Sequence, residues 1–111
     1  MPQLLSQFDL KDGITRDRFE VAWAGFVEGL VQAGVALDAG PIMTRRAASG
    51  YDTDAERQHG LMTLIQFSDH AQADAAWAMI EADEGPICTP HRKVIAMVSD
   101  PVFTFWDDTQ D

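Results

Sequence analysis

Apolar side chains occupy both alternating phases of the stretch 59–69, which predicts a central β-strand running into a helix. Successive strand residues point to opposite faces of a sheet. One phase carries Leu61, Thr63, Ile65 and Phe67, and the other carries Met62, Leu64 and Gln66. A strand with one face in water alternates apolar and polar residues, and this stretch does not. Both of its faces are therefore expected to be covered.

Three further strands are predicted by short apolar runs that turn residues bound, over 4–10, 42–47 and 102–106. A glycine and a proline precede the second of these runs. The stretch 49–58 is polar and contains several turn residues, which predicts a long hairpin loop. The last residues, 107–111, are expected to form a short acidic tail.

Helical periodicity predicts two main helices and a short third one. The first helix is expected to begin after the N-cap Thr15 and to end near Gly34. Ser68 or Asp69 caps the second helix, which carries an alanine-rich apolar stripe. Thr89 is the predicted N-cap of the third helix, and the proline that follows it is the predicted first helical residue.

The resulting order, β-α-β-β-α-(α)-β, is that of an α+β ferredoxin-like sandwich, with one antiparallel sheet and two main helices on one face. The other face then keeps large apolar side chains in water. Leaving four such side chains exposed forfeits roughly 6–12 kcal/mol, which rivals the whole stability of a domain. The pattern therefore predicts a homodimer that packs sheet to sheet about a two-fold axis.

Length and charge narrow the class of protein. A chain of 111 residues fits one domain, over 1–111. Its formal net charge of −10 repels phosphates and anionic lipid, so neither nucleic acid nor a membrane surface is an expected partner. The single Cys88 cannot form an internal disulfide, and the N-terminus lacks the pattern of a signal peptide. A cytoplasmic protein is therefore expected.

Three features together resemble the dimeric α/β-barrel superfamily. They are the element order over nearly all of the chain, the passage from Phe67 through Ser68 and Asp69 into an alanine-rich helix bearing Trp77, and the stretch 89–91 before a short helix and the last strand. Members include antibiotic-biosynthesis monooxygenases, haem-degrading monooxygenases, stress-responsive A/B-barrel proteins and EthD-like proteins. The resemblance implies a homodimer with a cavity between helices and sheet in each subunit.

The oxygenases of this superfamily typically use an asparagine on the first strand together with a tryptophan, and this chain contains no asparagine. The nearest polar residues on the predicted first strand are Ser6, Gln7 and Asp9. Of these, Gln7 offers an amide. The resemblance therefore implies the fold and the cavity without implying one chemistry, because one fold hosts many functions.

His91 is the candidate catalytic residue with the clearest physical argument. If the third helix begins at Pro90, His91 lies in its first turn, where unpaired N–H groups and the helix dipole lower its pKa. A neutral imidazole can serve as a general base or a haem ligand. The alternative is an exposed histidine without a role, because the sequence shows no partner for it.

Other residues are candidates for binding a substrate and not for catalysis. Trp23 and Trp77 lie on apolar helix faces that should meet the same sheet, so they either wall an aromatic cavity or belong to the core. Arg45 and Arg46 point to opposite faces of the predicted second strand. One of them, taken here as Arg46, can hold a carboxylate or phenolate, unless that strand lies at an edge in solvent.

Tyr51 and His59 flank the acidic part of the predicted hairpin loop, and they form either an acid–base lid over a cavity or a solvated loop. His59, His70 and His91 do not have the spacing of a metal site, so no metal ligand is predicted. No cofactor-binding motif is present either, and no cofactor is expected.

Two classes of function remain open at this stage. One is a cofactor-independent monooxygenase-like enzyme that acts on an aromatic or apolar small molecule, with His91 as base and Arg46 as anion anchor. The other is a non-catalytic dimer with a structural or small-ligand-binding role. A closed apolar pocket into which His91, or Tyr51 with His59, points would favour the first, whereas Trp23 and Trp77 filling the space completely would favour the second.

Overall fold

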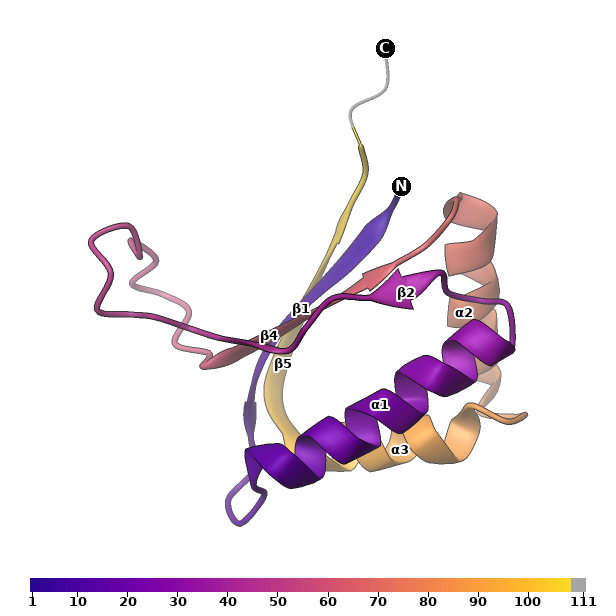
Figure 1. Cartoon of the computed structure of the whole chain (residues 1–111), viewed down its shortest axis with the longest axis horizontal. Coiled ribbons are helices and arrows are strands. Elements are labelled where there is room, and N and C mark those ends of the chain that lie inside the picture. The colour runs from indigo at the N-terminus through magenta and orange to yellow at the C-terminus, as the bar shows by residue number, and fades with distance from the viewer. Residues whose placement is uncertain (109–111) are drawn as a thin grey trace.

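The computed structural model describes residues 1–108 and contains one antiparallel sheet with its helices on one side (Figure 1). The strands are β1 (Gln3–Leu10), β2 (Asp38–Ala39), β3 (Met43–Thr44), β4 (Leu61–Gln66) and β5 (Val98–Trp106). The helices are α1 (Arg16–Gln32), α2 (His70–Ala82) and α3 (Cys88–Met97). This architecture confirms the predicted α+β ferredoxin-like fold. Residues 109–111 of the expected acidic tail lie outside the described residues.

The strand order is β2-β4-β1-β5, and β3 also pairs with β4, so β2 and β3 together form one interrupted edge strand. The backbone N–H of Gly40 still donates to Leu64 O at 3.0 Å. Pro41 has no N–H to donate, which explains the break. The predicted strand at 42–47 was therefore too long, because the ladder ends at Thr44 and begins earlier, at β2.

The caps of the two main helices agree with the sequence. The Thr15 hydroxyl accepts a hydrogen bond from Arg18 N at 3.3 Å, as expected for an N-cap. At α2 the cap is Asp69, one of the two candidates, and its carboxylate accepts from Gln72 N at 2.8 Å. Gly34 follows the last turn of α1 with φ +76°, a backbone conformation that glycine adopts without strain.

The third helix and the last strand differ from the sequence prediction. The predicted N-cap Thr89 is wrong, because α3 begins at Cys88 and Ile87 occupies the cap position without a side-chain hydrogen bond. The strand predicted over 102–106 was too short, because β5 starts at Val98, directly after α3. Asp100, with φ 53°, and Pro101 fall where the register against β1 shifts. A bulge of this kind at an edge tolerates a proline.

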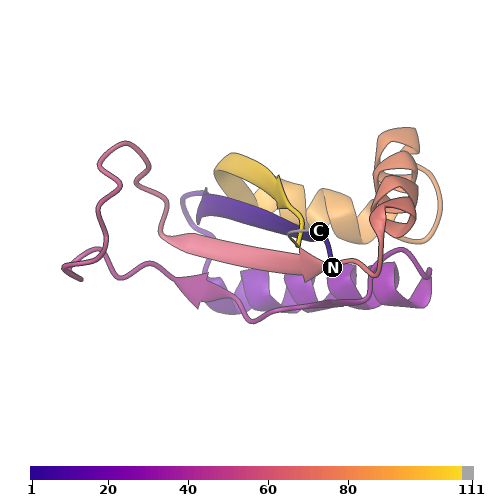
Figure 2. The ribbon, with the colours of Figure 1, turned by 90° about the horizontal axis from the view of Figure 1, so that it is seen from above.

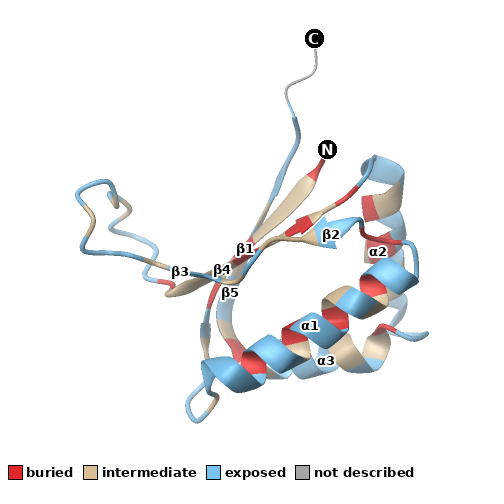
Figure 3. Ribbon diagram, viewed as in Figure 1, coloured by how far each residue is buried: buried red, intermediate tan, exposed pale blue. Residues whose placement is uncertain are grey.

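The core lies between the helices and one face of the sheet (Figure 3). Phe8, Ile65 and Phe67 supply the sheet side of this core. The α1 side consists of four residues at helical spacing, which are Phe19, Trp23, Phe26 and Leu30. The structure therefore settles which phase of the central strand faces the helices, namely the phase of Thr63, Ile65 and Phe67.

Within residues 1–108 the opposite face of the sheet has no helix on it, which confirms that the helices cover one face only (Figures 1 and 2). Cross-strand pairs place six apolar residues on this bare face, which are Leu5, Met43, Met62, Leu64, Val102 and Trp106. Trp106 is 60% exposed and Met43 is 49% exposed. The apolar excess expected from the sequence is therefore real.

Candidate functional site: a cavity between helices and sheet

A cavity of about 350 Å³ lies between the helices and the sheet. Its walls are mostly apolar, and they include aromatic rings from the helices and the strands alike: Phe8, Phe19, Trp23, Phe26, Phe67, Trp77 and Phe103. Only three lining residues carry polar side-chain groups other than an indole N–H, and these are Ser6, Thr63 and His91. Such a cavity has the size and composition of sites for small apolar ligands.

Trp23 and Trp77 line this cavity from α1 and α2, and Trp23 also belongs to the buried core. Their role in binding a substrate stays a prediction. The Trp23 ring lies 5.8 Å from that of Phe26, and the Trp77 ring lies 5.4 Å from that of Phe67. These contacts fix the two indoles in the walls. Because the cavity remains open beside them, the tryptophans do not fill the space.

His91 lines the same cavity from α3, with its ring 5.4 Å from that of Phe26. Burial lowers the pKa of His91 below its ordinary value of 6.5, and the nearby Asp83 carboxylate opposes this shift. The sequence argument attributed the lowered pKa to unpaired N–H groups in the first helical turn. The backbone N–H of His91 is instead paired, because it donates to Ile87 O at 2.9 Å. The imidazole is therefore neutral at neutral pH, because of desolvation.

Ser6 and Thr63 form the polar part of the cavity floor, on β1 and β4. They are 7% and 1% exposed, and Thr63 Oγ1 is buried without a hydrogen-bond partner. Leaving a buried hydroxyl unpaired costs about 1–3 kcal/mol. Sequence reasoning missed this feature of Thr63, because a β-branched side chain suits an apolar strand phase.

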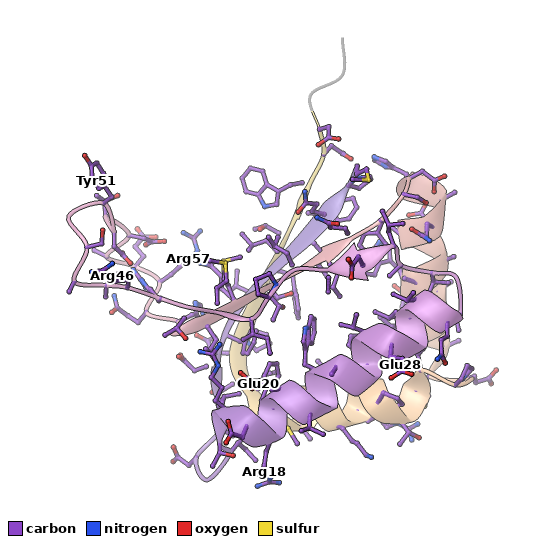
Figure 4. The ribbon with its side chains drawn as sticks, viewed as in Figure 1. Arg18, Glu20, Glu28, Arg46, Tyr51 and Arg57 are labelled. Carbon is purple, nitrogen blue, oxygen red and sulfur yellow. The ribbon has the colours of Figure 1, made fainter. Side chains whose placement is uncertain are left out.

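Tyr51, His59 and Arg46 do not line the cavity. Tyr51 is 98% exposed on the loop 45–59, and Arg46 is exposed on the same loop (Figure 4). His59 is buried, and its Nε2–H donates to Asp100 O at 2.7 Å. Tyr51 and His59 instead border a separate open depression at the base of this loop. Their catalytic roles and the anchoring role of Arg46 stay predictions.

Arg45, and not Arg46, organises the loop 45–59. Its guanidinium donates to both carboxylate oxygens of Asp52, at 2.7 and 2.6 Å, and to Asp54 O at 2.8 Å. It also donates to Arg57 O. A planar, forked donor is suited to such a set of acceptors. The two arginines are adjacent in sequence, and only the backbone path shows which one turns inward.

Acidification is expected to release the turn at Asp54 only as the pH approaches 2. Asp54 Oδ1 accepts from the backbone N–H groups of Glu56 and Arg57, at 2.9 and 3.0 Å. Arg57, through its backbone and side chain, holds the pKa of Asp54 at about 2, below the ordinary 3.8. A lowered folded-state pKa gives stability that is complete above 3.8 and is lost as the pH falls through about 2.

Amide exchange measured by NMR at Glu56 and Arg57 tests this prediction. Protection should persist from pH 5 to about 3 and disappear near 2. In Asp54→Ala it should be absent throughout, whereas Glu56→Gln, which keeps Asp54, should behave like the parent protein. Equal protection in Asp54→Ala and the parent would contradict the assigned hydrogen bonds.

Within residues 1–108, no group of three or more histidine, cysteine, aspartate or glutamate side chains is arranged to hold a metal ion. No helix of this part of the chain has the length and apolarity needed to span a bilayer.

No protein-family model and no curated protein sequence matches the chain. Solved structures do match over its full length. A protein of Arabidopsis thaliana, At3g17210, superposes with a TM-score of 0.76 at 8% identity, covering 100% of this chain and 98% of the other. A variant of SnoaB from Streptomyces nogalater, described as a cofactor-independent oxygenase, gives 0.69 at 10% identity, covering 99% and 94%.

A dimeric ferredoxin-like protein of unknown function from Thermobifida fusca gives a TM-score of 0.59 at 11% identity, covering 95% and 88%. The resemblance to ferredoxin-like dimeric proteins is thus confirmed at the level of the fold. At these identities the similarity does not assign one family or one activity.

Proposed function

We propose that this protein binds an aromatic small molecule in the helix–sheet cavity and oxidises it with O₂ without a cofactor, using His91 as general base. The observation that carries this proposal is the cavity itself, which is unfilled, largely apolar with aromatic rings in its walls, and lined by one titratable side chain within the described residues. The lowered pKa of His91 keeps that side chain neutral, as a base must be. The similarity to a cofactor-independent oxygenase supports the reaction class.

The proposed reaction draws its electrons from the substrate. His91 removes a proton from an activated CH₂ group flanked by aromatic rings, and the resulting carbanion reduces O₂. One oxygen atom remains on carbon as a carbonyl group, and the other leaves as water with the two hydrogens. An apolar, desolvated site strengthens the interactions that stabilise the anion, because the local dielectric constant is low.

We further infer that two copies pack through the bare sheet face. Six apolar residues on this face are half-buried or exposed in one subunit, and a second sheet would cover them. Similar structures described as dimeric ferredoxin-like proteins support this assembly. A two-fold arrangement brings the same surface of each copy together, so one set of apolar side chains serves both.

The alternative is a dimer that binds its ligand without reacting with it. One observation favours this alternative. Within residues 1–108 no side chain hydrogen-bonds the His91 imidazole, so no hydrogen bond from this part of the chain orients it before substrate binds. Oxygen uptake separates the two functions, since only the enzyme consumes O₂ when anthrone, which has such a CH₂ group, is supplied.

Filling the cavity is expected to weaken ligand binding strongly and to leave the fold intact. Ala76 is 1% exposed on the cavity side of α2, so Ala76→Phe places a ring in the open space. Anthrone binding, followed by quenching of tryptophan fluorescence, should weaken at least 50-fold. Ala75→Phe, at an exposed position on the same helix, is the matched control. Unchanged anthrone binding in Ala76→Phe would show that the ligand does not bind in this cavity.

A further inference from the structure

One row of side chains interrupts the apolar floor of the cavity. Ser6 and Thr63 are direct partners across β1 and β4, so they point to the same face, with Cβ atoms about 4.5–5.5 Å apart. The rows on either side pair Leu4 with Ile65 and Phe8 with Leu61, and both are apolar. The two hydroxyl groups therefore stand alone on the floor.

Thr63 is the unusual member of this pair. Its Oγ1 is buried and has no hydrogen-bond partner, not even Ser6 opposite. Valine has the same shape and would occupy this strand position without burying an unpaired hydroxyl. Packing alone therefore does not account for a threonine at this point, whereas a partner that arrives with a ligand does.

We propose that Thr63 and Ser6 form a hydrogen-bonding subsite for an oxygen atom of the ligand, so that the cavity selects aromatic molecules carrying a hydroxyl or carbonyl group. This inference rests on the proposed function and specifies its substrate class. A site built to bond an oxygen discriminates against the analogue lacking it, because that analogue leaves the buried hydroxyl unpaired.

The subsite also sets the orientation of the ligand. Ser6 and Thr63 lie on the sheet, and His91 lies on α3, so the polar groups come from different walls of the cavity. A ligand whose oxygen is held on the floor presents another part of its ring system to the imidazole. Thr63 thus acts as a specificity-determining residue and not as a catalytic one.

Calorimetric titration with two probes, 1-naphthol and naphthalene, tests the subsite. The titrations are done under argon, so that no oxygen reaction consumes the naphthol. The parent protein should bind 1-naphthol at least tenfold more tightly than naphthalene. In Thr63→Val this ratio should fall below threefold, through weaker naphthol binding with naphthalene binding unchanged.

Two further variants make the outcome specific. Thr63→Ser keeps a hydroxyl group and should retain a ratio above fivefold, and Thr53→Val, at an exposed loop position, should match the parent. Equal affinity for the two probes in the parent, or an unchanged ratio in Thr63→Val, would overturn the subsite and leave the proposed function standing. If neither probe nor anthrone binds, the proposed function fails, and the subsite fails with it.

Discussion

Replacing Leu64 with glutamate is expected to convert the proposed homodimer into a monomer. Leu64 lies on the bare face of β4, directly opposite Leu5 of β1, and sheet-to-sheet packing would bury it in the interface. An unpaired carboxylate buried there costs on the order of 3–5 kcal/mol. Since about 1.4 kcal/mol corresponds to a tenfold change, self-association should weaken roughly 10³-fold.

Sedimentation velocity at several micromolar concentrations measures this change. Val21→Glu is the matched control, because Val21 is 77% exposed on α1, away from the bare face, and should leave the dimer intact. Circular dichroism should show that Leu64→Glu keeps its secondary structure. A parent protein that sediments as a monomer, or a Leu64→Glu variant that remains dimeric, would refute packing through this face.

Replacing His91 with glutamine is expected to reduce oxygen consumption with anthrone by roughly 10²–10⁴-fold, the usual contribution of a general base. Glutamine keeps a polar group of similar size but cannot accept the proton. Anthrone binding should change less than threefold, because most of the cavity lining is apolar. The loss should therefore appear in kcat and not in KM.

The pH profile provides a second measurement of the same role. Burial lowers the pKa of His91 below 6.5, so the neutral form persists to lower pH than for a free histidine. Activity that needs a neutral base is present above this lowered pKa and is lost as the pH falls through it. An unchanged kcat in His91→Gln would remove the base assignment. A Soret shift with haemin that the variant loses would assign His91 as a haem ligand instead.

Periodicity predicted the features that depend on one face of one element. The two apolar phases of the stretch 59–69 predicted a sheet with one apolar face that the helices of the same chain do not cover. The helical spacing of Trp23 and Trp77 placed both indoles toward that sheet. Neither pattern shows whether the enclosed space is filled, because that depends on how far apart the helices and the sheet lie.

The parts that sequence reasoning missed depend on contacts between distant segments. The sequence could not show that Arg45, and not Arg46, turns inward, because the acceptors of Arg45 lie on a loop whose path the pattern does not define. Thr63 looked like an ordinary strand residue, and its unpaired hydroxyl becomes evident only when β1 is laid beside β4. The start of α3 was misplaced because a favourable cap, Thr89, stood one residue inside the helix.

Both outermost strands of the sheet contain a proline, Pro41 between β2 and β3 and Pro101 within β5. Proline donates no backbone hydrogen bond, and at Pro101 the chain is also kinked by the bulge. Neither border of the sheet is therefore a good template on which a further chain could extend it. Growth into fibrils by strand addition is disfavoured, which leaves the uncovered apolar surface to the proposed face-to-face pairing, an arrangement that stops at two copies.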